Sequence, residues 1–255
     1  MTTQPDRPRL WEIDAVRGIA VVLMAFFHLM WDLQFFGISN INVFSPPWQG
    51  FARAIGSAFI LLMGVSLTLD AERNNTNTRA LFIRHLKRGL TILGFGLVIS
   101  LATYVILGSQ FVRFGILHHA GVAIILAFFF VRAPSSVNWV VGLLVITLGF
   151  FVPQVVTTTT TMPWLLPLGI VPEGMTMVDY YPLIPWFGVA LMGICAGQWL
   201  YPKGQRQYRL PNLGSLLPAR LLSWVGRHSL AVYLLHQPVL IAVVFVIVHL
   251  VGVIR

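Results

Sequence analysis

Four ionisable side chains lie in one apolar run of the sequence, from Ile13 to Leu33. They are Asp14, Arg17, His28 and Asp32, and in a helix they would share an arc of about 60° on one face. Because His28 and Asp32 are four residues apart, the carboxylate can fix the imidazole tautomer and stabilise the imidazolium. A neutral histidine oriented in this way is a general base. The spacing therefore predicts His28 as a catalytic base oriented by Asp32; the alternative is a histidine that packs between helices.

The other two groups of this stripe lie near the start of the run. Asp14 and Arg17 are three residues apart and can neutralise each other. Arg17 and His28 are separated by about 16 Å along a helix axis, so they cannot touch. Ionisable groups inside a membrane span are costly and usually face a protein interior or a water-filled cavity. We therefore expect this helix to line a channel, with Asp14 and Arg17 near its cytoplasmic mouth and His28 farther out.

The last apolar run carries a second polar face. Ser229, Tyr233 and His236 follow at spacings of four and three, which places them on one side of a helix. Pro238 lacks a backbone N–H and is expected to kink or break that helix just past His236. These features favour a cavity wall over simple interhelical hydrogen bonding. The predicted cavity wall consists of Arg113, His118, Ser229, Tyr233 and His236.

The composition shows what kind of fold must position these groups. Of the 255 residues, 57% are hydrophobic and 10% are charged, against roughly 25% charged residues in a soluble domain. Apolar runs of about twenty residues recur, which is the length that crosses a bilayer as a helix. A soluble globular protein and a disordered chain are both excluded. The single cysteine, Cys195, allows no intrachain disulfide and no thiolate cluster, and we expect no metal site.

These runs predict an all-α membrane helix bundle that forms one integral-membrane domain over residues 1–255. It has a tail at 1–12 and an outer connection at 153–182. Residues 155–171 could instead enter the membrane as a re-entrant segment, so six to nine spans are compatible with the sequence. The seven predicted spans are Ile13 to Leu33, Phe51 to Leu69, Leu86 to Leu107, Phe111 to Val131, Val137 to Val152, Leu183 to Leu200 and Gly226 to Val251.

Positive charge is unevenly distributed between the connections. The N-terminal tail has two Lys or Arg residues, the segment from Asp70 to Arg88 has five, and the segment from Tyr201 to Arg227 has five. Under the positive-inside rule these segments face the cytoplasm, so with seven spans the C-terminus lies outside. Topology explains the net charge of +9. We therefore expect a lipid bilayer, and no nucleic acid, as partner.

Four stretches of the chain resemble the transmembrane acyltransferases. They are Arg9 to Ala20 with His28, Phe114 to Gly121, Pro185 to Gly188 with Gly193 to Gly197, and Ser229 to Pro238. In this order they are most similar to the heparan-alpha-glucosaminide N-acetyltransferase branch and its small bacterial relatives. The resemblance implies a multi-pass protein of a bacterial inner membrane.

The resemblance also implies a reaction. An acetyl or other acyl group would pass from cytoplasmic acyl-CoA, with acetyl-CoA as donor and no tightly bound cofactor, to a sugar or glycan acceptor across the membrane. In the glycan O-acetylating branch, the functional arginine and histidine correspond to Arg17 and His28. In the heparan-type enzyme the key histidine follows the first span, where this chain has none between Gln34 and Gly50. The residues expected to bind the donor or line its tunnel are Asp14, Arg17, Arg88 and Arg227.

Two other functions fit the same residues. A transporter or flippase for a glycan or lipid precursor could use the polar stripe as a permeation path. A haem-binding electron carrier could take axial ligands from histidines on different spans. Release of CoA that depends on His28 would distinguish the acyltransferase from the transporter.

Overall fold

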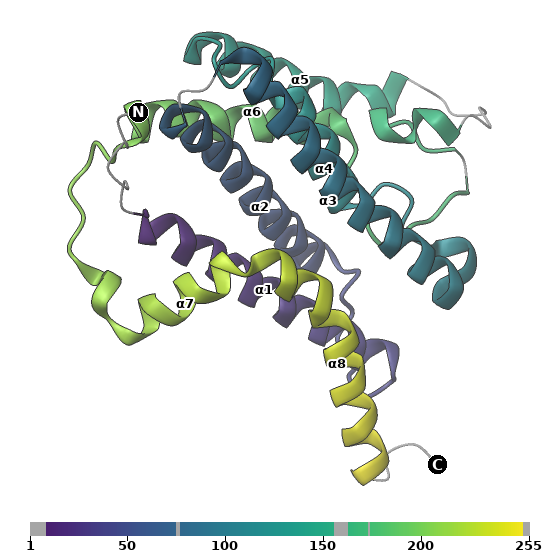
Figure 1. Cartoon of the computed structure of the whole chain (residues 1–255). Helices are drawn as coiled ribbons and strands as arrows, with labels where there is room; N and C mark the ends of the chain where they lie inside the picture. Colours follow the sequence, from purple (N-terminus) through teal and green to yellow (C-terminus); the bar gives the residue numbers. More distant parts are fainter. Residues whose placement is uncertain (1–8, 75–76, 156–162, 173, 252–255) are drawn as a thin grey trace. The chain divides into compact units, whose positions relative to one another are not determined.

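The computed structural model describes residues 9–74, 77–155, 163–172 and 174–251 (Figure 1). Within these residues the ordered elements are helical and no β-strand is present, which confirms the predicted all-α class. Five helices are long and apolar enough to cross a membrane, and two shorter helices are also apolar. The principal helices are α1 (Trp11–Phe35), α2 (Pro46–Arg73), α3 (Thr78–Leu107), α4 (Ile116–Ala127), α5 (Ser135–Val155), α6 (Leu183–Leu200), α7 (Leu217–Arg227) and α8 (Ser229–Val251).

The chain divides into two compact units, which we describe separately. The first comprises residues 1–59 and 209–255, and the second comprises residues 60–208. Helix α2 contributes its N-terminal part to the first unit and its C-terminal part to the second. The single membrane domain and the seven spans therefore remain predictions.

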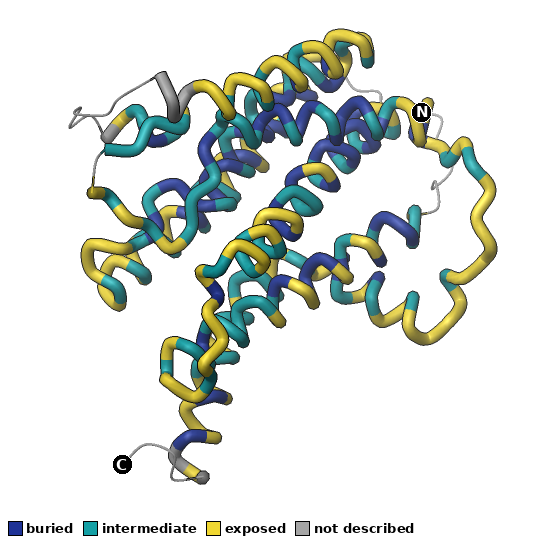
Figure 2. Tube along the Cα trace, turned by 180° about the vertical axis from the view of Figure 1, so that it is seen from behind, coloured by how far each residue is buried: buried dark blue, intermediate teal, exposed yellow. Residues whose placement is uncertain are grey.

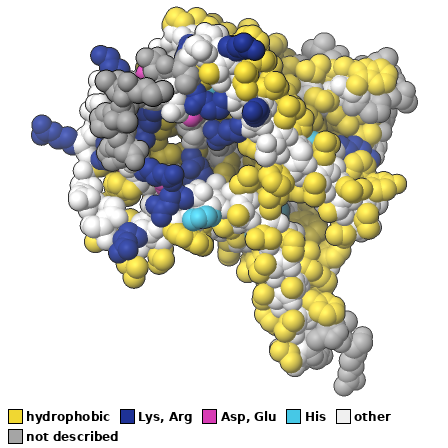
Figure 3. Space-filling view, viewed as in Figure 1, with side chains coloured by type: hydrophobic (Ala, Val, Ile, Leu, Met, Phe, Trp, Pro, Cys, Tyr) yellow, Lys and Arg dark blue, Asp and Glu magenta, His cyan; other side chains and the backbone are white. Residues whose placement is uncertain are grey.

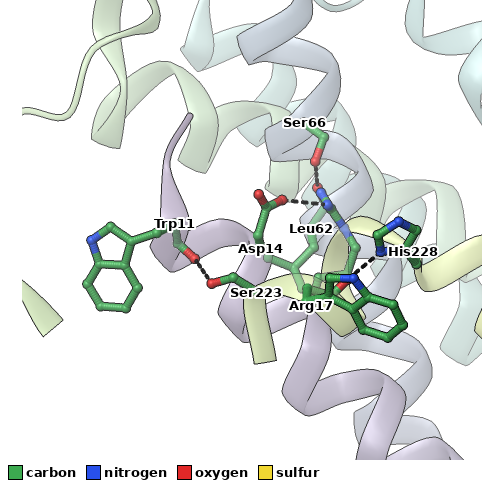
Figure 4. Close-up of polar contacts among 8 residues, drawn as sticks. Trp11, Asp14, Arg17, Leu62, Ser66, Ser223 and His228 are labelled. Carbon is green, nitrogen blue, oxygen red and sulfur yellow. Dashed lines mark hydrogen bonds and ion pairs between the residues drawn. The ribbon is translucent and has the colours of Figure 1, made fainter. Parts of the chain in front are cut away.

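In the first unit, α1 packs against both α7 and α8. The contact with α7 depends on glycines. A Cβ at Gly18 would overlap the carbonyl oxygen of Leu222, and a Cβ at Gly226 would overlap that of Asp14. Ser223 of α7 is buried and its hydroxyl donates to the carbonyl of Trp11 at 3.2 Å (Figure 4). Backbone contact thus fixes α7 to the first turns of α1.

Helix α8 runs beside the C-terminal half of α1. The surface of α8 that faces away from α1 is largely apolar, and Figure 3 shows hydrophobic side chains over much of this helix. Figure 2 shows exposed residues along α8 toward the C-terminal end. A long helix with exposed apolar side chains fits a lipid environment.

The second unit contains a close-packed apolar core. Helix α3 packs on α4, and α5 packs on α6. Ile124, Leu191 and Ile194 are fully buried at its centre. Glycines again permit close approach, because a Cβ at Gly188 would overlap the carbonyl oxygen of Gly142 on α5. The Thr68 hydroxyl of α2 donates to the Ile194 carbonyl at 3.1 Å.

The predicted fourth span begins later than the sequence indicates. Helix α4 starts at Ile116, whereas we predicted helix from Phe111. The preceding residues are extended, and Phe114 forms an isolated parallel bridge with Tyr180. The Asp179 carboxylate accepts a hydrogen bond from the Ile116 N–H at 3.0 Å and so caps α4. A residue 63 positions away sets this helix start.

The last predicted span is divided differently from our expectation. Residues 217–227 form a separate helix, α7, and His228 separates it from α8. We predicted a kink or a break just past His236. Helix α8 continues through Pro238 to Val251, so a break at this point is wrong. A membrane helix tolerates proline where neighbours satisfy the freed carbonyl. The predicted re-entrant stretch is described only from residue 163 onward, where Pro163–Leu168 form a 3₁₀ helix.

Candidate functional site

A buried carboxylate joins α1 to α8. The side chain of Asp32 has 0% exposure. Its Oδ1 accepts a hydrogen bond from Nε2 of Gln237 at 2.6 Å. Within the described residues, Oδ2 of Asp32 and Oε1 of Gln237 are buried and have no hydrogen-bond partner. Buried polar atoms are nearly always paired, so two unpaired acceptor atoms at one contact make this position a candidate for the functional site.

Two histidines lie beside this contact. The ring centroids of His28 on α1 and His236 on α8 are 4.8 Å apart. Nδ1 of His236 lies 2.6 Å from the carbonyl oxygen of Tyr233. Nε2 of His236 is buried and has no hydrogen-bond partner in the part of the chain that the structure describes. The cluster of His28, Asp32, Tyr233, His236 and Gln237 is called the histidine cluster below.

The predicted pairing of His28 with Asp32 is not formed. Within residues 9–74 and 174–251, no hydrogen bond joins the two side chains, and Asp32 bonds Gln237 instead. The four-residue spacing places both on one helix face, but the amide from α8 occupies the carboxylate oxygen. Sequence reasoning missed Gln237. The signal for it was an amide side chain inside an apolar run, directly after His236.

A second polar group lies at the contact of α1 with α7. A guanidinium nitrogen of Arg17 forms an ion pair with Oδ1 of Asp14 at 3.2 Å, as the three-residue spacing predicted (Figure 4). Arg227 lies exposed in the last turn of α7, the helix that carries Gly226 against Asp14. Ser229, a predicted wall residue, begins α8. Of the predicted residues in the first unit, Asp14, Arg17 and Arg227 therefore lie near one end of α1, and His28 lies about 16 Å farther along it.

Three predicted site residues belong to the second unit. Arg88 lies exposed on α3. Arg113 donates to the carbonyl of Thr176 at 3.3 Å and stacks over the ring of Phe111. His118 is buried on α4, with Nε2 3.2 Å from the Ser100 hydroxyl. These residues are thus spread over α3, α4 and the connection between them.

The outer connection of the second unit is held by polar contacts. The Tyr181 N–H donates to the carbonyl of Phe114 at 2.9 Å, and the Tyr180 hydroxyl donates to that of Leu166 at 2.8 Å. Burial raises the pKa of the Asp179 carboxyl to about 6, although its hydrogen bond from Ile116 acts in the opposite direction. This carboxyl therefore titrates closer to neutral pH than an ordinary aspartate does.

The chemistry available at the histidine cluster is proton transfer. It offers two imidazoles, a carboxylate and unpaired acceptor atoms, all from α1 and α8. In the described residues, no group of three His, Cys, Asp or Glu side chains could hold a metal ion. Proton transfer to and from a nucleophile is the reaction that imidazoles perform at neutral pH.

Comparison with known families gives the family of the chain. The family model of the heparan-alpha-glucosaminide N-acetyltransferase catalytic domain matches residues 9–238. This range includes α1 and the part of α8 up to Pro238. The chain belongs to this family. No curated protein and no solved structure matches it. Membership of the heparan-alpha-glucosaminide N-acetyltransferase family indicates a multi-pass membrane protein with transmembrane acetyltransferase activity.

Proposed function

We propose that the protein transfers an acetyl group from cytoplasmic acetyl-CoA to a hydroxyl or amine of a sugar or glycan on the far side of a bacterial inner membrane. Family membership supports the acetyl transfer. The observation that carries the proposal is the histidine cluster. It brings two imidazoles to a ring separation of 4.8 Å beside a buried carboxylate, inside helices apolar enough to span a bilayer.

The donor end of this path is proposed at the other end of α1. Arg17 and Arg227 are cations near the start of α1, and CoA carries phosphates that guanidinium groups bind well. Asp14 holds Arg17 in place through their ion pair. Arg88 on α3 is a further donor-binding candidate. The positive-inside rule gives these segments a cytoplasmic location, where acetyl-CoA is available.

The sugar side of the path is proposed at the histidine cluster. His28 and His236 act on the reacting groups there, and one of the two imidazoles takes the proton that the acceptor loses when it attacks the thioester. An enclosed site would also keep water from hydrolysing the donor. Walls formed by two apolar helices help to exclude water.

The proposal is tested in proteoliposomes that hold acetyl-labelled CoA on the cytoplasmic side and a soluble aminosugar on the other. We expect CoA to be released on the cytoplasmic side and labelled acetyl-sugar to appear on the other side. His28→Ala should lower both by about 10² to 10⁴. The matched control is His228→Ala, because His228 is an exposed histidine that caps α7. Movement of sugar without CoA release would show a transporter and contradict the proposal.

A further inference from the structure

The two histidines of the cluster differ in how their rings are held, and we propose that His236 is the residue that takes the proton from the acceptor. The assignment rests on the acyl transfer proposed above. A backbone carbonyl can only accept a hydrogen bond, so the contact of 2.6 Å with Tyr233 requires the proton of His236 to be on Nδ1. In the neutral ring, Nε2 then carries a free lone pair.

That lone pair has no partner in the protein. Nε2 of His236 is buried and makes no hydrogen bond to any described residue. A buried imidazole nitrogen without a donor costs free energy, unless an arriving ligand supplies an O–H or N–H. The acceptor hydroxyl or amine is the group in the proposed reaction that brings such a hydrogen. Geometry and tautomer thus both present His236 as the base.

The ring of His28 is held differently. It is partly exposed, and no hydrogen bond within the described residues fixes either of its nitrogens. Its tautomer is therefore free to place an N–H toward a neighbouring oxygen. With the rings 4.8 Å apart, His28 can donate to the carbonyl oxygen of the thioester while His236 accepts from the nucleophile.

Gln237 acts through its neighbour as a positioning residue. Its amide is tied to the fully buried Asp32 at 2.6 Å, one position along α8 from His236. This bond fixes the rotation of α8 about its axis against α1. The rotation in turn holds the ring of His236 at 4.8 Å from that of His28.

Acetyl transfer to the acceptor forms one bond to the carbonyl carbon and breaks the C–S bond. The acceptor oxygen or nitrogen forms a bond to the thioester carbonyl carbon, and its proton moves to Nε2 of His236. The carbonyl oxygen, which becomes negative, is stabilised by the His28 N–H. The C–S bond then breaks, the CoA thiolate leaves, and the His236 imidazolium returns the proton to the sulfur. The products are the acetylated acceptor and CoA thiol.

The test compares two acceptors in purified protein. Methyl glucosaminide needs a base in the protein, whereas hydroxylamine is nucleophilic at neutral pH without one. His236→Asn keeps an amide N–H in place of Nδ1 for the Tyr233 carbonyl and lacks Nε2. We expect it to lose about 10² to 10⁴ in acetyl transfer to the glucosaminide and less than tenfold with hydroxylamine. His28→Asn should slow both acceptors alike. His228→Asn is the control and should slow neither.

Two results would overturn the assignment. One is near-normal glucosaminide acetylation by both His236→Asn and His236→Ala. The other is rescue by hydroxylamine of His28→Asn and not of His236→Asn, which would exchange the two roles. Failure of the wild-type protein to acetylate either acceptor is a different outcome, and it would overturn the proposed function together with this assignment.

Discussion

Gln237 of α8 donates a 2.6 Å hydrogen bond to Asp32 of α1 at a position where the carboxylate has no exposure. The two residues are 205 positions apart in the chain. This bond connects the first helix of the protein to its last one. Its loss would leave a buried carboxylate without its partner in the protein.

Gln237→Leu should therefore lower stability. Leaving a buried acceptor unpaired costs about 1 to 3 kcal/mol, more for a charged group, and the unfolding midpoint in detergent measures the change. The control is the double variant Asp32→Leu with Gln237→Leu, which removes both partners. We expect it to lose less than the sum of the two single variants. Additive losses would mean that the bond contributes nothing.

The contact between α1 and α7 should be sensitive to one methyl group. Gly226→Ala places a Cβ against the Asp14 carbonyl, so the helices must separate. Overpacking of this kind typically costs about 1 to 3 kcal/mol. Gly50→Ala is the matched control, because it lies in a helix of the same unit and its Cβ would meet nothing within 4 Å. Equal unfolding midpoints for the two variants would contradict the close approach.

Arg17→Ala should impair use of the donor. If Arg17 binds a CoA phosphate, the KM for acetyl-CoA rises about tenfold or more, since a charge-assisted hydrogen bond contributes roughly 1.5 to 3 kcal/mol. The KM for the sugar should stay unchanged. Asp14→Asn helps to separate the roles, because it removes the charge of the ion-pair partner and leaves the guanidinium. An unchanged donor KM in a folded Arg17→Ala protein would reduce Arg17 to a structural partner of Asp14.

Topology gives a prediction that needs no activity. A reporter fused after Arg255 should be active only outside the cytoplasm, and one inserted between α2 and α3, after Arg73, only inside it. The reason is the concentration of Lys and Arg in the segment 70–88, which includes the facing ends of α2 and α3. A cytoplasmic C-terminus would show that the predicted number of spans is wrong by one.

Asp179 should make stability depend on pH. Its pKa of about 6 lies above that of an unfolded aspartate, so the folded protein binds the proton more tightly. Ionisation of Asp179 therefore lowers the free energy of unfolding above about pH 6, and this effect disappears as the pH falls toward about 4. Asp179→Asn keeps an oxygen for the Ile116 N–H and cannot ionise. The unfolding midpoint of the variant should lie above that of the wild type at pH 7, and the two midpoints should converge at pH 4. The same difference between the midpoints at both pH values would contradict this prediction.

The helical stripe of α1 could be predicted because it depends on local periodicity alone. Asp14 and Arg17 pair as their spacing indicates. The partner of Asp32 could not be predicted, because it depends on how α8 is rotated against α1. In that contact the amide of Gln237, and not the His28 ring, reaches the carboxylate.

Three features of the helix boundaries differ from the prediction. The start of α4 is set by Asp179, which lies far away in the sequence. Proline chemistry predicts a kink or a break at Pro238, and α8 continues through it without a break. The division between α7 and α8 at His228 carries no proline or glycine at the break, although Gly226 lies two residues before it.

The single helix that carries both Arg17 and His28 has a further consequence for the proposed reaction. An α-helix of this length does not shorten, so the separation of about 16 Å between these residues acts as a molecular ruler. A donor whose phosphates are held at Arg17 needs a flexible arm of that length to bring its thioester to the histidines. A short thioester without a charged end could not bind Arg17 and reach the histidines at the same time. Helix α1 would then select its donor by length.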